Sequence, residues 1–442
     1  MSVFRRVLHA REWLWTAAPA LLLIAAAFWA TYQFVEPAPP DRIVVASASK
    51  GSPYHALAER YRAFLAKNGV KLEVRETSGS FENRKLLASG EVQAGFLQGG
   101  IAPGADVSQL RSLGRVLYEP LWIFHDAGTP LDKLSDLRGK RILVGPAGGG
   151  TNHLAVRLLA ASGVTPVNAT FINMELPDYA DALANGRADA GFLVLAANAQ
   201  TVRRLFADPR LKLLSLAQAD ATAQRFPYLT RLDLKRGIVD LGRDIPPADV
   251  AMVATTAAFV VREDLHPALA NLLTQALLAV HAEPAIDEKG EAGVFQRSGD
   301  FPLRSDPEYT LSDEARRVYR AGPPLLQRYL PFWLATLADR LIVMLIPLIG
   351  ILLPVLRLAP VVYNWRVRRR ILYWYRALKR IEAGFDPKAG ADHLAQKQSE
   401  IDAIEQAVNR LPVPLGYTNQ LYDLREHVEL VRRRLTEKTA ES

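Results

Sequence analysis

The chain has 442 residues, a formal net charge of +8 and no cysteine. Its length exceeds that of one typical domain, so more than one structural unit is expected. The missing cysteines exclude disulfides, thiolate metal sites, cysteine nucleophiles and a lipoprotein anchor, and they leave the redox compartment open. Much of the positive charge follows a long apolar segment, where membrane topology and anionic lipid explain it better than nucleic acid does.

The first long apolar segment covers residues 16–35 and follows Arg5, Arg6 and Arg11. About 20 apolar residues suffice for a helix that crosses a bilayer core. Because Lys and Arg collect in cytoplasmic loops, residues 1–15 are predicted to form a cytoplasmic tail before a transmembrane helix. A cleaved signal peptide is the alternative, which the length of the segment and the lack of a small-x-small cleavage motif disfavour.

Short apolar runs alternate with amphipathic stretches after a Pro-rich stalk at 37–40. This alternation predicts an α/β fold with parallel strands and right-handed crossovers. In chain order, we expect a strand at 43–46, a helix at 54–67, a strand at 71–76, a helix at 81–89 and a strand at 92–97, followed by a strand at 141–144, a helix at 151–161, a strand at 169–172, a helix at 178–184 and a strand at 188–195.

Two longer apolar runs, 116–124 and 250–261, lie at the edges of the middle of the chain. A chain that passes from one lobe to another and back would cross at these places. We therefore expect a binding domain over 41–325 with two lobes. The first lobe consists of about 41–122 plus 253–325, and the second of about 123–252. One continuous doubly wound domain is the alternative.

The second long apolar segment covers residues 341–362, and seven Arg and Lys residues follow it between 366 and 380. It is predicted to be a second transmembrane helix with a cytoplasmic C-terminal side, which leaves residues 36 to about 340 outside. Pro347, Pro354 and Arg357 lie within the segment. Neighbouring groups can satisfy a kinked membrane helix, and an Arg near its end can reach the interface. A buried helix of the globular domain is the alternative.

The remaining chain, 363–442, is predicted to be a cytoplasmic helical tail. Apolar residues recur at helical spacing in two stripes separated by Pro412, Pro414 and Gly416. The stripes predict a helical hairpin or a short coiled coil, which pairs with itself or with a cytoplasmic partner. The first stripe contains Leu394, Ile401, Ile404 and Val408, and the second Leu421, Leu424, Val428, Val431 and Leu435.

A Gly-rich segment, 145–152, follows a predicted strand and opens a predicted helix. Glycines allow a tight turn with successive N–H groups aimed at one spot, where the helix dipole adds positive potential. The spacing resembles a phosphate-binding P-loop but lacks its Lys, so nucleotide hydrolysis is not expected. A ligand carboxylate suits the loop better. A plain Gly-rich turn with Thr151 as N-cap is the alternative.

Two further strand ends, 47–54 and 77–83, carry small hydroxyl residues and Gly. Ligands bind at the carboxyl ends of strands in open α/β sheets. Three such loops, spread over both expected lobes, indicate a small acidic ligand enclosed between them.

Catalytic patterns are sparse. The eight histidines are scattered, with no metal-ligand spacing, and neither a G-x-S-x-G elbow nor a pair of acidic residues stands out. Zinc-finger, RNA-recognition and basic-zipper patterns are missing as well. We therefore expect no enzyme activity, no metal, no cofactor and no nucleic-acid partner.

The loops and their order resemble the TAXI family of solute receptors that serve TRAP transporters. The similarity begins at 43–54, continues over 76–91 to Gln98, and returns at 144–152, 183–190 and 255–264. It covers about residues 41–282, and the order of the motifs is more specific than any one of them. The resemblance implies a two-lobed periplasmic-binding-protein fold, type II-like, with two crossing strands.

The resemblance also implies which residues bind the ligand, by their matching positions in the motifs, and which partners the protein has. The implied ligand is a small organic acid such as glutamate, 2-oxoglutarate or another dicarboxylate, which the receptor passes to a TRAP-type permease. The residues are Ser49, Tyr54, Ser80, Asn83 and Gln98 in the first lobe, and Gly149, Gly150, Thr151 and Asn152 in the second.

Two features depart from this family. Lys50 and Ser52–Pro53 interrupt a loop that is usually richer in Gly, and receptors of the family generally lack a second span and a tail. The expected protein is a receptor anchored in a bacterial inner membrane, with both termini cytoplasmic and a periplasmic binding domain. The alternatives are a transmembrane sensor that relays binding to the tail, and an anchored enzyme.

Overall fold

The computed structural model describes residues 22, 24–26, 28–29, 31–33, 37–175, 178–197, 199–283, 294–295, 299–384, 391–413 and 415–440. The predicted tail 1–15 and most of the predicted first span lie outside these residues. Two compact units can be distinguished. One is Pro37–Asp339, and the other combines Arg340–Ser442 with Met1–Glu36.

Unit 37–339 is built around a mixed sheet that has ten strands within the described part of the chain. Eight strands follow in the order β2-β1-β3-β10-β4-β7-β5-β6, while β8 pairs with β4 and β9 with β10. The strands are β1 (Arg42–Ala46), β2 (Lys71–Arg75), β3 (Ala94–Gln98), β4 (Leu110–Asp126), β5 (Arg141–Leu143), β6 (Thr170–Ile172), β7 (Ala190–Val194), β8 (Leu211–Leu213), β9 (Leu229–Leu234) and β10 (Val250–Arg262).

The outer strands are parallel, as the alternation of strands and helices predicted. β1 runs parallel to β2 and β3, and β5 runs parallel to β6 and β7. We call the first group, with its helices, the β1 half of the unit, and the second group, with its helices, the β5 half. Each parallel pair is joined by a helix, as a crossover connection requires.

The two long strands, β4 and β10, belong to both halves. They pair antiparallel with each other from Leu110 opposite Arg262 to Pro120 opposite Ala254. In addition, β10 pairs with β3, and β4 pairs with β7. The apolar runs 116–124 and 250–261 lie within these strands, whose side chains are buried along most of their length. The lobe boundaries proposed from the sequence remain a prediction.

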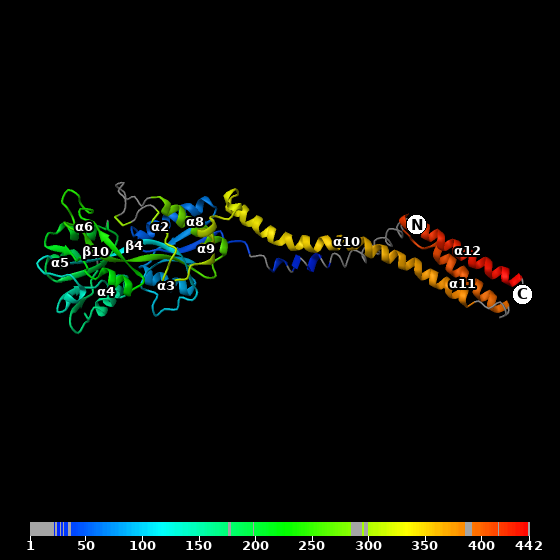
Figure 1. Cartoon of the computed structure of the whole chain (residues 1–442), viewed down its shortest axis with the longest axis horizontal. Coiled ribbons are helices and arrows are strands. Elements are labelled where there is room, and N and C mark those ends of the chain that lie inside the picture. Colours follow the sequence, from blue (N-terminus) through cyan, green and yellow to red (C-terminus); the bar gives the residue numbers. More distant parts are fainter. Residues whose placement is uncertain are drawn as a thin grey trace. The chain divides into compact units, whose positions relative to one another are not determined.

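Helices cover both halves of the sheet (Figure 1). At the β1 half lie α2 (Pro53–Lys67), α3 (Ser80–Ser89), α8 (Pro267–Ala282) and α9 (Asp313–Ala321). At the β5 half lie α4 (Gly150–Ala161), α5 (Tyr179–Ala184), α6 (Gln200–Ala207) and α7 (Ala219–Arg225). The short 3-10 helices are η1 (Leu134–Leu137), η3 (Leu326–Arg328) and, in the tail, η4 (Leu415–Tyr417).

Each half has a hydrophobic core of its own. Tyr61, Phe96 and Phe259 are fully buried in the β1 half, where the rings of Phe96 and Phe259 lie 4.9 Å apart edge to face. Phe192 is fully buried in the β5 half. Burying an aromatic side chain of this size stabilises a fold by roughly 1.5–3 kcal/mol. The buried clusters of one half are separate from those of the other, so the unit has two bodies that β4 and β10 connect.

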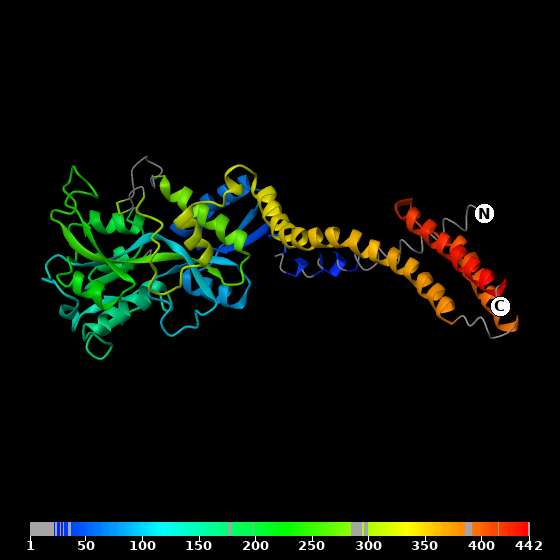
Figure 2. The same cartoon turned by 45° about the vertical axis from the view of Figure 1, so that its right-hand side comes forward.

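A single long helix, α10 (Phe332–Ala383), contains the predicted second span. It runs without interruption over 52 residues, through Pro347 and Pro354 (Figure 2). By length and composition it is the one described helix that is able to cross a membrane, and none of its most apolar window is buried. This exposure argues against the alternative of a buried core helix.

The end of α10 packs with α11 (Ala391–Asn409) and α12 (Thr418–Ala440). The predicted stripes meet in one core, apart from Leu394, whose side chain lies outside the described part of the chain, and α10 adds Ile371, Leu378 and Ile381 to this core. Arg432 on α12 forms ion pairs with Asp402 and Glu405 on α11. The tail is therefore a bundle of three helices rather than an isolated hairpin.

Candidate functional site

Tyr54 lies at the start of α2, where the loop after β1 ends. The hydroxyl of Ser52 accepts a hydrogen bond from the His55 N–H and Pro53 begins the helix, both typical of a helix start. The ring of Tyr54 stacks on that of Phe96, with the ring centroids 5.1 Å apart, and this contact holds the ring in place. Its hydroxyl donates to Glu119 Oε1 at 2.7 Å. Burial raises the pKa of Tyr54 well above its ordinary value, so the group stays a donor.

Ser80 and Gln98 lie next to this hydroxyl. Ser80 Oγ is 3.3 Å from Tyr54 Oη and accepts a hydrogen bond from the Gln98 N–H at 2.9 Å. Ser80 begins α3 and Gln98 ends β3, so the carboxyl ends of β1 and β3 meet here. The structure thus brings together three of the five residues predicted in the first lobe.

Asn83 and Ser49 differ from these three. Asn83 is fully buried, and its side-chain amide donates to Ser47 O and Phe96 O and accepts from Thr77 Oγ1. All but one of its hydrogen-bonding positions are thus satisfied within the protein, which makes it a brace for the loops after β1 and β2. Ser49 is exposed, and its carbonyl accepts from Ser52 N–H in a turn.

The Gly-rich loop approaches from the β5 half. Gly145 and Gly148 have φ angles of 92° and 74°, which favour glycine. The helix α4 begins at Gly150 with Gly149 as N-cap. In the first turn of a helix the N–H groups lack intrahelical acceptors, so those of Gly150, Thr151 and Asn152 are available to an anion.

Thr151 does not act as the N-cap, which corrects one of the alternatives drawn from the sequence. Its hydroxyl accepts a hydrogen bond from the Val194 N–H at 3.2 Å and thereby ties α4 to the end of β7. The hydroxyl proton is still available to a ligand, because a hydroxyl both donates and accepts. Asn152 is partly buried and lines a shallow depression of about 600 Å³ beside α4, together with His153 and Arg157.

The two halves touch at this point. A Cβ atom on Gly150 would lie 1.9 Å from Gln98 Oε1, so the side chain of Gln98 occupies the space above Gly150. His153 Nε2 is 3.1 Å from Gly100 O, and the His153 ring meets Phe81 edge to face. The loop after β3 and the start of α3 thus contact the first turns of α4.

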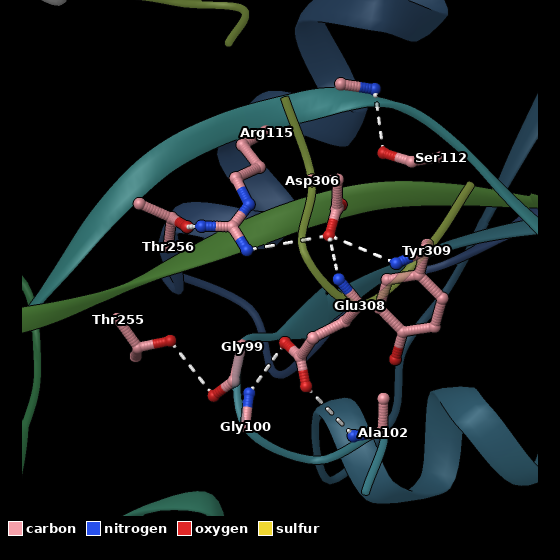
Figure 3. A network of polar contacts seen from close by, with 11 residues as sticks. Gly99, Gly100, Ala102, Ser112, Arg115, Thr255, Thr256, Asp306, Glu308 and Tyr309 are labelled. Carbon is pink, nitrogen blue, oxygen red and sulfur yellow. Dashed lines mark hydrogen bonds and ion pairs between the residues drawn. The ribbon is translucent and has the colours of Figure 1, made fainter. Parts of the chain in front are cut away.

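A buried polar network fixes the loop that follows Gln98 (Figure 3). The carboxylate of Glu308 accepts from the Gly100 N–H at 2.7 Å and the Ala102 N–H at 3.3 Å. Burial raises the pKa of Glu308. Thr255 Oγ1 donates to Gly99 O from β10. The loop is therefore held from the strand β10 and from the segment before α9.

The same segment carries Asp306, which orders the turn around Glu308 (Figure 3). Asp306 Oδ1 accepts from the N–H groups of Glu308 and Tyr309 and lies 3.5 Å from Arg115 Nη2. Arg115 Nη1 donates to Thr256 Oγ1 at 2.5 Å. Both charged side chains are almost fully buried. Sequence reasoning missed this network, because residues 300–312 show neither a strand pattern nor a motif.

Glu119 was missed as well. It lies on β4 opposite Thr255 of β10, and its Oε1 accepts from Tyr54 Oη. Its Oε2 atom is buried and has no hydrogen-bond partner among the described residues. Burial raises the pKa of Glu119 to about 7. The signal in the sequence was a single Glu inside the apolar run 116–124.

The described residues contain no group of three or more His, Cys, Asp and Glu side chains that is able to hold a metal ion. The donors that do converge are backbone N–H groups, hydroxyls and amides. Such groups bind and orient a small polar ligand.

Residues 45–283, more than half of the chain, match the model of the NMT1-like family. The chain belongs to the NMT1-like family. Its match ends at α8, so the segment with Asp306 and Glu308, α9 and α10 lie beyond the part of this NMT1-like protein that the family model covers.

Solved structures with distant likeness to this NMT1-like chain include solute-binding proteins and the effector binding domain of BenM. The periplasmic aliphatic sulphonate binding protein SsuA from Escherichia coli is 15% identical, with a TM-score of 0.38 over 71% of this chain and 83% of that one. The alkanesulfonate-binding protein SsuA from Xanthomonas axonopodis pv. citri, bound to MOPS, is 23% identical, with a TM-score of 0.31 over 40% of this chain and 61% of that one. An ancestral arginine-binding protein bound to arginine is 15% identical, with a TM-score of 0.34 over 54% and 91%. No curated protein matches the chain.

Proposed function

We propose that this chain is a membrane-anchored extracytoplasmic receptor of the TAXI type, which binds a small organic acid and passes it to a TRAP-type permease. The observation that carries the proposal is the meeting of Gln98 with Gly150. It places the carboxyl end of β3 against the start of α4, so that two separately packed halves face each other across loops rich in donors. The ligand class is glutamate-like or dicarboxylate-like.

In this proposal the ligand carboxylate binds at the start of α4. The free N–H groups of Gly150, Thr151 and Asn152 and the hydroxyl of Thr151 supply the donors, and the helix dipole favours the negative charge. Gly149 gives the N-cap its shape. Gln98 swings away from Gly150 to admit the ligand, and its amide then contacts the bound molecule.

The β1 half supplies the opposing wall. Tyr54 and Ser80 face the ligand, Asn83 positions the loops that carry them, and the exposed Ser49 lies at the rim. The lobes, 41–122 with 253–325 and 123–252, close on the ligand through bending of β4 and β10. Hinge closure of this kind binds a ligand without breaking a bond, so no enzyme activity is proposed.

The length and exposure of α10 and the charges around it support a membrane anchor. We propose that 16–35 and 341–362 span a bacterial inner membrane, with both termini cytoplasmic and the binding domain periplasmic. The Arg and Lys side chains between 366 and 380, of which all but Arg370 are exposed, then meet anionic lipid at the cytoplasmic surface.

A sensor is the second candidate. The observation that favours it is the continuity of α10, which leaves unit 37–339 and ends in the three-helix bundle without a break. In that case ligand binding is relayed to a cytoplasmic partner of the bundle or to a second copy of it. Deleting residues 385–442 separates the candidates, because a sensor loses its cellular response while its ligand affinity is kept.

Thermal unfolding of the full-length protein in detergent, with a panel of small carboxylic acids, tests the proposal. A ligand present at 100 times its dissociation constant stabilises the folded state by about 2.7 kcal/mol. We expect at least one acid to raise the midpoint of unfolding of the wild type but not of Gly150→Val. A panel without any stabilising acid contradicts the proposal.

A further inference from the structure

Glu119 is a carboxylate that contacts the residues gathered at the ends of β1 and β3 and the start of α3, and unlike Glu308 it does not serve to hold the loop after β3. It stands on β4, one of the two strands that both halves share, opposite Thr255 of β10. Its neighbour Tyr54 contacts Ser80, and Ser80 holds the backbone of Gln98. Glu119 is thus part of the wall to which the proposed function assigns ligand contact, although no sequence motif pointed to it.

The two oxygens of this carboxylate differ. Oε1 accepts the Tyr54 hydroxyl at 2.7 Å, whereas Oε2 is buried without a hydrogen-bond partner among the described residues. A buried carboxylate oxygen without a donor is costly, since burial removes its hydration and nothing replaces it. The Oε2 atom therefore keeps an unused acceptor position, which a donor on a ligand fills once Gln98 has moved away from Gly150.

The chain's own cations do not serve Glu119. Arg115, the nearest cationic residue along β4, is engaged by Thr256 and Asp306. Lys50 lies in the loop before Tyr54, but it is exposed and pairs with Glu76. The strongest donor for a buried carboxylate is a cationic N–H, because charge-assisted hydrogen bonds are roughly twice as strong as neutral ones.

We propose that Glu119 Oε2 accepts a hydrogen bond from a cationic nitrogen of the ligand, so that the site selects acids that also carry an ammonium group. This inference rests on the proposed function, and it divides the ligand class left open there. The start of α4 takes the carboxylate and Glu119 takes the ammonium. An acid without the ammonium group brings no donor to Oε2, so this buried oxygen stays without a hydrogen bond when such an acid binds.

Matched pairs of ligands test the proposal, with full-length protein in detergent and titration calorimetry at pH 8. The pairs are L-glutamate with glutarate and L-aspartate with succinate, which differ only in the amino group. The wild type is expected to prefer the amino acid of a pair by about 10-fold to 100-fold, the range for a hydrogen bond to a charged group. Glu119→Gln keeps the size of the side chain and should lose most of this preference.

Two further variants distinguish the loss of the ammonium contact from a general loss of ligand binding. Gly150→Val removes the proposed carboxylate site and should weaken both members of a pair, whereas Glu119→Gln should weaken only the amino acid. Tyr54→Phe keeps the Glu119 carboxylate and should keep the sign of the preference, which covers the case that Glu119→Gln fails to fold.

The proposal is overturned if the wild type binds the amine-free acid of a pair as tightly as the amino acid, or if Glu119→Gln retains the preference. The first result leaves the proposed receptor function intact, because a carboxylate is still bound. If no acid of either kind binds to the wild type, the receptor function fails together with the inference.

Discussion

Gln98 Oε1 lies 1.9 Å from the point that a Cβ atom on Gly150 would occupy. The two residues come from different halves of the sheet, and the contact depends on Gly150 having no side chain. The φ angle of Gly150 is not in the left-handed region, unlike those of Gly145 and Gly148. Gly150 is therefore needed for space and not for backbone freedom.

Gly150→Ala is expected to destabilise the protein by at most about 1 kcal/mol, since the added methyl group has to push aside only the flexible end of the Gln98 side chain. The double variant with Gln98→Ala should recover most of this loss, because the obstructing side chain is gone. Urea unfolding of the four proteins in the cycle measures the coupling. Additive losses in the double variant would show that Gln98 and Gly150 do not meet.

Glu308→Gln should destabilise the protein by about 1–3 kcal/mol, because a Gln amide cannot accept from both Gly100 and Ala102. The control is Glu314→Gln, which removes the same charge from a surface ion pair with Arg317. That change should stay within about 0.5 kcal/mol. Chemical unfolding of both variants decides the point, and equal effects would contradict the role given to Glu308.

His281 makes stability depend on pH. Burial, aided by Arg60, lowers the pKa of His281 to about 4, and Tyr61 Oη lies 2.9 Å from its Nε2. The unfolded chain therefore binds a proton near pH 6.5 that the folded chain refuses until about pH 4. Stability from this group is complete above pH 6.5 and is lost as the pH falls toward 4, by at most about 3 kcal/mol.

His281→Phe should remove this contribution to acid sensitivity, although its stability at pH 7 falls because Tyr61 loses its partner. The measurement is the free energy of unfolding of both proteins between pH 7 and pH 4. Parallel curves would show that His281 titrates no differently in the folded and unfolded protein.

The proposed membrane topology is tested with reporter fusions. A reporter that is active only outside the cytoplasm should be active after Leu311 and inactive after Glu382, because the Arg and Lys residues that follow 341–362 favour the cytoplasmic side. Expression of each fusion is checked by immunoblot. Activity after Glu382 together with inactivity after Leu311 would reverse the proposed orientation.

Local patterns in the sequence were sufficient for much of the fold. The alternation of apolar and amphipathic stretches predicted β1, α2, β2 and α3 within about one residue at most ends, because each element is specified by its own periodicity. The Gly-rich segment 145–150 predicted that a helix begins near Thr151, and α4 begins at Gly150. The apolar runs 116–124 and 250–261 lie within the long strands β4 and β10, whose burial on both faces explains the runs, although β4 begins earlier, at Leu110.

The missed features depend on partners that are distant in the chain. Glu308 meets Gly100 across about two hundred residues, and nothing in 300–312 signals that contact. The role of Asn83 as a brace depends on Ser47, Thr77 and Phe96, which only the folded chain assembles. Likewise, the third helix of the tail bundle is the end of α10, whose basic and aromatic residues concealed its apolar face.

Titration calorimetry on the full-length protein tests the central claim most directly, namely that the loops of the two halves together hold a small carboxylic acid. We predict saturable binding of one acid per chain for the wild type, and no measurable heat for Gly150→Val under the same conditions. Binding that is equally tight in Gly150→Val would contradict the account, because the start of α4 would then have no part in holding the ligand.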